Sequence, residues 1–479
     1  MPYPPPTPGW WAASAAPTDC SIAPPPGKSR PWPKLGGPGA VWPPITCGGR
    51  SRNGYFHLEI DTTGESAMQK TGLIALILLS LGSTAVARVI HVEASWLGVT
   101  GTGSQFDPYS DLQQAIDQAG DGDTLIVAPG YYSARPEPYP ENLAGNTEQH
   151  RTTVNASRGF LVKDKALTIR GSGPDRTTLM TNAGYGVLFL NSRGSLLENV
   201  AVTGGVRDAD GNATDAGVVA KFSTLTLRRV HVRDNDHRLD SVVVGIGGIF
   251  GRENSELTIL HCEIANNGWD GIALYRGATA YLADNVIREG RGAGIGITWD
   301  AAAVVLRNRI SGYWKGIGTF GSSRAVVANN LVQDCLGWGL IATGDSYLDA
   351  SNNNVLHNGN CGLAIWSETC RGRFINNIVA GNGWKEEWVA PPVGLVNFGG
   401  AENFIIAHNN FWDNSQGNYR DLPDLTGVNG NLSADPLFLS GGDYRLGETS
   451  PCRDSGSPLL SEGDGSVSDM GMHGGPMAR

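Results

Sequence analysis

The sequence contains little that would suit a membrane protein or a nucleotide-binding enzyme. Its apolar run at residues 73–81 is far shorter than the roughly 20 residues that a transmembrane helix needs. It has no glycine-rich phosphate loop, and its cysteines match no zinc-ligand spacing. Charged residues make up only 17% of the chain, and no helical period runs through its central part. These absences disfavour a membrane-spanning protein, a nucleotide-binding enzyme and a helical fold.

The first 87 residues have the character of an export segment preceded by an unstructured stretch. Residues 1–67 are rich in proline, glycine and tryptophan and show no strand or helix period. From Met68 follow a basic Lys70, the apolar run and the small residues Ala85-Val86-Ala87, an order typical of a secretory signal peptide. We therefore expect cleavage near Ala87 and a secreted, periplasmic or cell-surface protein. Because signal peptides stand at the amino terminus, we interpret residues 1–67 as a start-site error, with a genuine disordered extension as the alternative.

The rest of the chain is rich in glycine, asparagine, valine and isoleucine, and glycine alone accounts for 66 residues of the whole sequence. That composition favours many short strands separated by tight turns. Without residues 1–87 the chain carries 30 basic and 42 acidic side chains, a net charge of −12. An acidic surface repels nucleic acid and anionic lipid, so we expect neither as a partner.

A six-residue pattern, apolar-x-Asn-Asn-x-apolar, returns along the chain at nearly constant intervals. The clearest copies are at residues 327–332 and 374–379, with shorter or weaker copies on both sides. The closing apolar residues stand at positions 264, 287, 310, 332, 355 and 379, so the successive intervals are 23, 23, 22, 23 and 24 residues. Outside this stretch the intervals widen to about 30–32. Such a period indicates an internal structural repeat.

A second element, a glycine followed by an aliphatic strand, keeps step with the first, as in Gly271-Ile-Ala-Leu and Gly362-Leu-Ala-Ile. Each repeat therefore holds at least two short strands with bends at Asn or Gly, and it is too short for a βαβ crossover. The geometry that remains winds the chain so that each strand pairs with its equivalent one coil later, about 4.8 Å away. We predict an all-β parallel β-helix with coils of about 22–32 residues, in which asparagines stack into a ladder.

The ends of such a stack of coils expose strand edges that must be covered. Residues 110–119 begin with Ser110, a helix-capping residue type, and carry apolar Leu112, Ala115 and Ile116 at helical spacing. A strand at residues 123–128 follows directly. We expect a short amino-terminal helix that caps the first coil.

Five cysteines follow residue 87, an odd number that matches no disulfide scaffold. Export would permit disulfides. Cys335 and Cys361 should fall on neighbouring coils, where they could pair. The alternative is that each is a small buried apolar side chain.

Several motifs carry a resemblance to a known group of proteins. GDTLIVAPGYY at 122–132, LTIRGSGP at 167–174 and the Asn-Asn repeats resemble the pectin-lyase-like right-handed parallel β-helix superfamily. The closing motifs are similar to the tails of secreted bacterial members: ADPLF (434–438), DYRL (443–446), SPCRDSG (450–456) and SDMGMHGG (468–475). The resemblance implies a right-handed β-helix at 88–430 and a tail at 431–479 that packs on it or caps it. It implies no single activity, because the superfamily includes lyases, hydrolases, epimerases and non-catalytic surface proteins.

The glycine-started strands should form one outer face of the β-helix. If Ile272 and Leu274 point inward, then Gly271, Ala273 and Tyr275 point outward, and the equivalent positions of later coils are mostly small. Aromatic residues border this floor, and their faces are platforms on which sugar rings can lie. The predicted substrate-binding residues are Tyr275, Trp299, Phe320, Trp366 and Phe398. The alternative is that loops or a second subunit pack over the floor.

Asp300 and Asp345 follow equivalent strands two coils apart, so their backbones should lie roughly 10 Å apart. Carboxylates about 6.5–9.5 Å apart suit inverting glycoside hydrolysis, in which one is the acid and the other the base. We name this pair as candidate catalytic residues, with solvated turn carboxylates as the alternative. A polysaccharide lyase would instead need a base and a cation, and Arg276, Lys315 and Arg324 show no cluster in the sequence.

One polar loop concentrates oxygen ligands of the kind that Ca²⁺ prefers. It contains Asp208, Asp210, Asn212 and Asp215 but lacks the glycine position of an EF-hand. A calcium ion is the only cofactor that the sequence suggests, and an ordinary polar hairpin is the alternative.

These observations lead to two hypotheses for function. The first is a secreted β-helix protein that binds an extracellular polysaccharide and cleaves or modifies it as a lyase or a glycoside hydrolase. The second is a non-catalytic surface protein of adhesin-like or structural character. A convergent pair of charged residues in an open cleft would favour the first, and a covered floor would favour the second.

Overall fold

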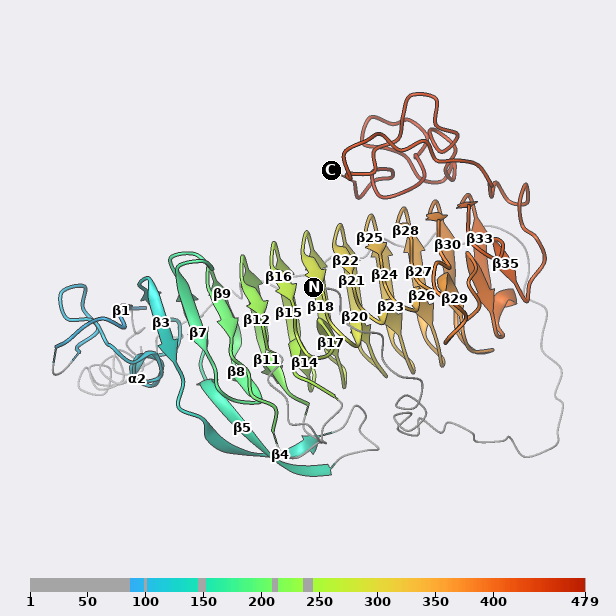
Figure 1. The fold of residues 1–479 in the computed structure, drawn as a ribbon. Helices are drawn as coiled ribbons and strands as arrows, with labels where there is room; N and C mark the ends of the chain where they lie inside the picture. The colour runs from blue at the N-terminus through green and yellow to red at the C-terminus, as the bar shows by residue number, and fades with distance from the viewer. Residues whose placement is uncertain (1–86, 99–100, 145–151, 209–213, 236–243, 479) are drawn as a thin grey trace, which may run out of the picture. The chain divides into compact units, whose positions relative to one another are not determined.

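The computed structural model describes residues 87–98, 101–144, 152–208, 214–235 and 244–478, which belong to one unit of the chain, Ala87–Arg479 (Figure 1). The expected extension at 1–67 and the signal peptide up to residue 86 lie outside the described residues. Among the described residues, no helix is both long and apolar enough to cross a bilayer.

The coils of the chain form three parallel sheets, and each coil contributes one strand to each sheet. The first sheet contains β1 (Val89–Val92), β2 (Thr124–Val127), β6 (Thr168–Arg170), β9 (Arg193–Glu198), β12 (Thr224–Arg228), β15 (Glu256–Leu260), β18 (Thr279–Ala283), β21 (Ala302–Leu306), β24 (Arg324–Ala328), β27 (Tyr347–Ser351), β30 (Arg371–Ile375) and β33 (Phe404–Ala407). The second sheet contains β3 (Gly130–Ser133), β7 (Thr177–Met180), β10 (Ala201–Thr203), β13 (His231–Arg233), β16 (Glu263–Ala265), β19 (Val286–Arg288), β22 (Arg309–Ser311), β25 (Leu331–Gln333), β28 (Asn354–Leu356), β31 (Ile378–Ala380) and β34 (Asn410–Trp412).

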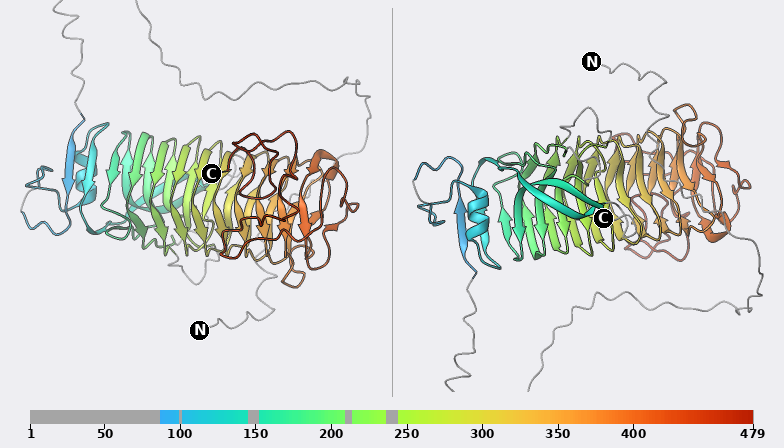
Figure 2. Two further views of the ribbon diagram at one scale, coloured as in Figure 1. Left: turned by 90° about the horizontal axis from the view of Figure 1, so that it is seen from above. Right: turned by 90° about the horizontal axis from the view of Figure 1, so that it is seen from below.

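The third sheet forms the face on which the candidate site lies. It contains β4 (Glu137–Ala144), β5 (Thr152–Lys163), β8 (Tyr185–Leu190), β11 (Ala216–Lys221), β14 (Gly247–Arg252), β17 (Ile272–Leu274), β20 (Ala293–Ile297), β23 (Lys315–Thr319), β26 (Trp338–Ala342), β29 (Cys361–Ile365), β32 (Leu395–Asn397) and β35 (Tyr419–Arg420). Successive strands are parallel and in register, as in Ile272 opposite Ile295 and Ile295 opposite Ile317. Strands β4 and β5 differ, because they pair antiparallel and form a hairpin. The predicted right-handed parallel β-helix is confirmed, and Figure 2 shows its stacked coils from two opposite sides.

Apolar side chains at the same position of successive coils fill the interior. One column, formed by Ile272, Ile295, Ile317, Leu340 and Leu363, is fully buried. Side chains of the same kind stack at the strand spacing, which removes each of them from water. Each Å² of apolar surface buried in this way contributes roughly 25 cal/mol to the free energy of folding.

Helix α2 (Leu112–Gln118) covers the first coil with Leu112, Ala115 and Ile116, all buried. A cap at Ser110 would start the helix at residue 111, but the helix starts at Leu112. Asp111 takes that role, because its extended backbone lets its side chain accept a hydrogen bond of 2.9 Å from the backbone N–H of Gln114.

Buried asparagines form a continuous column at one bend of the coils. Each side-chain amide donates to the side-chain oxygen of the next residue at 2.9–3.1 Å, in the order Asn285, Asn308, Asn330, Asn353, Asn377, Asn409 and Asn431. The same oxygens accept backbone N–H groups, as between Asn308 N–H and Asn330. The column therefore satisfies buried polar groups that a turn would otherwise leave unpaired.

The five cysteines of the described residues are free and buried. Cys335 points into the core between the sheets, whereas Cys361 packs among aromatic residues on the outer side of the third sheet. The pairing considered from the sequence is absent from these residues, because the two side chains lie on opposite faces of the coil wall.

Residues 431–478 lie along the outer side of the second sheet. Side chains of three asparagines with left-handed backbone, Asn329, Asn352 and Asn376, donate to residues of this segment, for example from Asn352 to the carbonyl of Asp469 at 2.8 Å. Cys452 and Met470 pack against apolar residues of β25, β28 and β31. Specific hydrogen bonds and apolar contacts thus hold this segment against the coils.

Candidate functional site

The outer face of the third sheet follows the predicted alternation at most positions. Ile272 and Leu274 belong to the interior, whereas Ala273 and Tyr275 lie outside it. The leading glycine is an exception, because a Cβ on Gly271 would lie 2.7 Å from the interior side chain of Ile287. The expectation that this glycine points outward is wrong, since the chain is still turning into the strand there. The residues one position earlier form the outer row instead: Asp270, Ala293, Lys315, Trp338, Cys361 and Val393.

The β4–β5 hairpin covers the amino-terminal part of this face (Figure 2, right). Ala144, Val154 and Ala156 of the hairpin pack on outward residues of the coils below. Those residues are Tyr185, Leu188, Ala216, Val219, Phe250, Ala273 and Tyr275. This part of the face is an apolar interface and is closed to a ligand.

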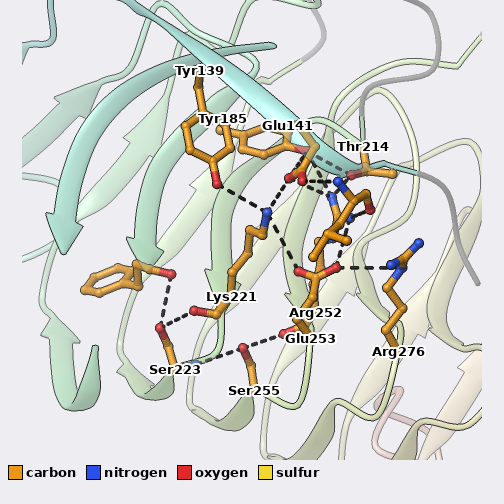
Figure 3. Close-up of polar contacts among 12 residues, drawn as sticks. Tyr139, Glu141, Tyr185, Thr214, Lys221, Ser223, Arg252, Glu253, Ser255 and Arg276 are labelled. Atoms are coloured by element: carbon orange, nitrogen blue, oxygen red, sulfur yellow. Dashed lines mark hydrogen bonds and ion pairs between the residues drawn. The ribbon is translucent and has the colours of Figure 1, made fainter. Parts of the chain in front are cut away.

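An ionic cluster lies beneath the hairpin (Figure 3). The carboxylate of Glu141 in β4 lies 2.5 Å from the ammonium of Lys221 and 3.6 Å from the guanidinium of Arg252. Glu253 lies 3.2 Å from Arg252, and Arg276 approaches Glu253 at 3.7 Å. All five side chains are at most 4% exposed. The charges are therefore buried, but each has a partner of opposite sign.

The pKa values in this cluster follow from burial and from the neighbouring charges. Burial alone would raise the pKa of Glu141, but the charges of Arg252 and Lys221 lower it. Burial lowers the pKa of Lys221, against the attraction of Glu141 and Glu253. Burial raises the pKa of Glu253 despite Arg252. The hydroxyl of Tyr185, which accepts from Arg252 at 2.9 Å, completes a network that ties the hairpin to four coils.

A second cover, the loop at residues 384–393, packs on the carboxy-terminal part of the same face. Val389, Ala390 and Val393 of this cover loop contact the outward side chains of β26, β29 and β32. A chain of aromatic contacts runs beneath and beside it. The ring centroids of Trp314 and Trp338 are 5.7 Å apart, and those of Trp338 and Trp366 are 5.4 Å apart.

An open pocket of about 500 Å³ lies where the cover loop meets the end of this aromatic chain. Trp366, Phe398 and Trp388 contribute rings, and the centroids of Trp366 and Phe398 are 4.4 Å apart. Phe398 is 47% exposed and Trp388 is 40% exposed, so both rings face solvent. The remaining lining residues of this aromatic pocket are Glu387, Val389, Ala390, Pro391, Arg420 and Asp421. Exposed charges of both signs thus border a set of aromatic faces.

Asp270 and Lys315 are the two charged members of the outer row. One oxygen of Asp270 accepts from the backbone N–H of Ala293 at 2.6 Å. The Lys315 ammonium lies over the rings of Trp314 and Phe320, at 4.5 and 4.9 Å from their centroids. It has no hydrogen bond or ion pair within the described residues. Both charged side chains are recessed, but each keeps some accessible surface.

The two groups influence each other without being paired. Burial raises the pKa of Asp270 to about 6, against the hydrogen bond from Ala293 and the charge of Lys315. Burial lowers the pKa of Lys315, and the charge of Asp270 opposes that change. Each group is therefore shifted toward its neutral form, a combination that is enriched at functional sites.

In the structure, the five predicted substrate-binding residues do not form one groove. Trp366 and Phe398 line the aromatic pocket, and Phe320 lies under Lys315. Trp299 is half-buried beside Gly321 of the next coil. Tyr275 is only 6% exposed, because the hairpin covers it and its ring packs on Phe250 with centroids 5.5 Å apart.

The candidate catalytic carboxylates Asp300 and Asp345 are both exposed, at turns two residues before β21 and β27. Strand β24 lies between those strands in the first sheet, in agreement with two coil steps. Asp300 accepts a hydrogen bond of 2.8 Å from the backbone N–H of Gly277, which directs its carboxylate toward the preceding coil. The structure brings neither residue to the aromatic pocket.

The predicted calcium loop is described only in part, because Asp210 and Asn212 lie outside the described residues. Asp215 lies 2.6 Å from the guanidinium of Arg207. Asp208 accepts hydrogen bonds from the backbone and the hydroxyl of Ser157. In the part of the chain that the structure describes, no three His, Cys, Asp or Glu side chains are grouped so as to hold a metal. A calcium site here therefore stays a prediction that depends on undescribed residues.

Sequence reasoning did not find the cover loop or the charged residues of the aromatic pocket. The one signal was the interval between the apolar residues Val379 and Phe411, which is 32 residues instead of 23 and marks an insertion. An insertion in a coil can fold outward or back over the coil, and the sequence does not distinguish these cases. Asp270 and Lys315 each stand directly before the glycine of their coil. Once this position is known to face outward, the two charged residues can be assigned to the outer face from the sequence.

Comparisons with known proteins found one family model and several similar solved structures. Residues 247–415 match the family model described as right handed beta helix region. Similar solved structures include pectate lyase Pel9A, with 14% identity, coverage of 80% of this chain and 96% of that chain, and a TM-score of 0.48. The A-module of the Azotobacter vinelandii mannuronan C-5 epimerase AlgE6 has 17% identity, coverage of 68% and 96%, and a TM-score of 0.40. The Dettilon tailspike protein has 14% identity, coverage of 72% and 62%, and a TM-score of 0.46.

No curated protein matches the chain. The right-handed β-helix that the sequence predicts is confirmed, by the family model over residues 247–415 and by the three parallel sheets. An activity does not follow from it, because one fold hosts many functions.

Proposed function

We propose that this protein binds a polysaccharide in the aromatic pocket. The observation that carries the proposal is that Trp366, Trp388 and Phe398, from three segments of the chain, present rings to one open pocket. Sugar rings have apolar C–H faces that pack on aromatic faces, while their hydroxyls need polar partners at the edge. Glu387, Arg420 and Asp421 supply such partners.

The size and continuation of the pocket favour a chain-like ligand. A volume of about 500 Å³ falls within the range of roughly 300–1,000 Å³ that is typical of small-ligand sites. The aromatic contacts continue from Trp366 through Trp338 to Trp314, which also lies against Trp388 with centroids 5.8 Å apart. Trp338 is only 5% exposed beneath the cover loop, so a ligand longer than the pocket would pass along Trp388 and Trp314 toward Lys315.

The export segment expected at residues 68–87 makes the proposed ligand an extracellular one. This part of the proposal rests on the sequence pattern of a basic start, an apolar run and a small-x-small end. Edman sequencing of the protein recovered from the medium or periplasm of its expression host would test it. A first residue near Arg88 is expected, and retention of Met68 in the cytoplasm would contradict it.

Binding can be tested with the full chain by calorimetric titration against a panel of neutral and acidic polysaccharides. Trp388→Ala and Trp366→Ala should each weaken binding at least about tenfold, because each removes an aromatic face from the pocket. Trp384→Ala is the matched control. Trp384 is 47% exposed and stacks on His357 outside the pocket, so its removal should leave affinity within about twofold. Equal affinities of all three variants, or no binding by the wild type, would refute the proposal.

The second hypothesis, a non-catalytic surface protein, is favoured by one observation. The two carboxylates expected to act together, Asp300 and Asp345, are exposed at turns, and neither lines the aromatic pocket. Release of reducing ends or of unsaturated sugars from a bound polysaccharide would contradict this hypothesis. Binding without any product would support it.

A further inference from the structure

We infer that Lys315 and Asp270 form a two-sided subsite that selects an acidic sugar residue, with Lys315 binding the anionic group and Asp270 a hydroxyl of the same residue. The inference rests on the proposed polysaccharide binding and names the substrate class: a glycan that carries carboxylate or sulfate groups. Such a subsite would let a protein of net charge −12 beyond residue 87 bind an anionic polymer.

Lys315 is a recessed cation without a hydrogen-bond acceptor or an anionic partner among the described residues. An ammonium has three donors, yet within the described residues that of Lys315 contacts only the faces of Trp314 and Phe320. On the same face Lys221, also recessed, lies 2.5 Å from Glu141. A recessed ammonium without an acceptor loses hydration without compensation, so an anionic group at this position would restore the missing interaction.

Asp270 faces the same space from the other side. Its second carboxylate oxygen would lie 3.6 Å from a Cβ placed on Gly296, and no described atom would come closer to that Cβ. Gly296 therefore leaves room above the strand next to the carboxylate. Asp270 and Lys315 belong to one row with Ala293 between them, so their backbones are two strand spacings, about 10 Å, apart. The Asp270 carboxylate reaches from its own coil over Gly296 of the next one, so it lies on the side of the row that faces Lys315.

The surroundings place the acidic residue at Lys315 and not in the aromatic pocket. Glu387 and Asp421 border the pocket and would repel a second carboxylate there, although Arg420 offsets part of that repulsion. Trp314 contacts both Lys315 and Trp388, so one aromatic side chain links the subsite to a ring that lines the pocket. One glycan chain can therefore place a sugar against the aromatic rings and an acidic residue over Gly296.

The test compares three oligosaccharides of equal length by calorimetric titration of the full chain. These are an oligogalacturonate, its carboxyl-reduced neutral counterpart and a sulfated galactan. At least one acidic probe should bind about tenfold or more tightly than the neutral probe. Lys315→Gln should abolish that preference, so that the acidic and neutral probes bind this variant with affinities within about twofold of each other. Lys163→Gln, at an exposed lysine of the hairpin, is the control and should keep the preference.

Each outcome has a separate meaning. Preference for the carboxylate or for the sulfate identifies the anionic group and supports the inference. Binding of all three probes with equal affinity, or a preference that survives in Lys315→Gln, overturns the inference and leaves the proposed function intact. If the wild type binds no polysaccharide of the wider panel, the proposed function fails and the inference fails with it. Retained affinity of Lys315→Gln for the neutral probe shows that this variant is folded.

Discussion

Two regions on the outer face of the third sheet each contain a recessed lysine, but only one of these lysines has carboxylate partners. Beneath the β4–β5 hairpin, Lys221 is surrounded by Glu141 and Glu253, at 2.5 and 3.9 Å. Four coils further along, Lys315 lies on two aromatic rings and has no anionic partner among the described residues within ion-pair distance. The first arrangement fastens a cover to the coils, and the second leaves a charge available to a ligand.

The comparison teaches that a recessed charge indicates function only when its partner is missing. Both lysines have a pKa lowered by burial. They differ in whether a distant segment supplies a carboxylate, because Glu141 is 80 residues away from Lys221 in the sequence. The following predictions test this contrast, in order of decreasing effect.

Lys221→Met should cause the largest loss of stability. It leaves the carboxylates of Glu141 and Glu253 buried with Arg252 but without the second cation that they share, a loss that costs about 3–5 kcal/mol. Lys315→Met removes a cation without an ion-pair partner and should change stability by less than about 1 kcal/mol. Urea unfolding followed by circular dichroism measures both. Equal losses in the two variants would contradict the distinction between the regions.

Glu141→Gln should cost about 2–3 kcal/mol. The amide keeps the size of the side chain but gives up charge-assisted contacts to Lys221 and Arg252. Glu137→Gln is the control in the same strand, because Glu137 is 57% exposed and its ion pair with Arg158 contributes less than about 1 kcal/mol. The same urea titration applies. If Glu137→Gln lost as much stability as Glu141→Gln, the loss would follow from any change in strand β4 and not from the burial of Glu141.

Asp270→Asn should stabilise the protein at pH 8 by on the order of 2 kcal/mol. Because the pKa of Asp270 in the folded state is about 6, above the usual 3.8, the folded protein holds this proton more tightly than the unfolded chain does. The resulting contribution to stability is present below about pH 4 and is lost as the pH rises through 6. The amide removes this titration, so thermal unfolding should show a gain at pH 8 and little gain at pH 4. An equal gain at both pH values would contradict an origin in the ionisation of Asp270.

Gly247→Ala and Gly296→Ala should differ by about 1–2 kcal/mol. A Cβ on Gly247, beneath the hairpin, would collide with the ring of Phe250, and such overpacking is costly. A Cβ on Gly296 would meet only ordinary contacts at 3.6 Å or more, so its stability should change by less than about 0.5 kcal/mol. Thermal unfolding of the two variants provides the measurement. A large loss in Gly296→Ala would mean that the space above this strand is already filled.

The repeat was predictable because it is local. The Asn-Asn bends, the glycine-started strands and the apolar spacing of α2 each involve residues within a few positions, and each reappears in the structure near its expected bounds. The direction of Gly271 was not predictable from strand alternation, because the chain has not yet entered the strand there and the alternation begins only at Ile272. The cap of α2 shifted from Ser110 to Asp111 for a similar reason, since both residue types can cap and only the backbone decides.

The candidate site depended on contacts that no local pattern records. Trp366 and Phe398 could be named from their place in the coils, whereas Trp388 reaches the aromatic pocket only because the cover loop folds back. Tyr275 has the same position in its coil as Trp366, yet the hairpin buries it.

By itself the sequence determined the coils, because a period of about 23 residues forces equivalent strands to pair at the strand spacing and their apolar side chains to stack. Only the tertiary structure decided which part of the resulting face is closed and which is open. The hairpin arms at residues 137–144 and 152–158 and the cover loop at 384–393 are inserted between coils, and their free energy of packing depends on side chains from several coils at once. The same contacts decide whether a lysine on that face already has its carboxylate or can bind one from outside.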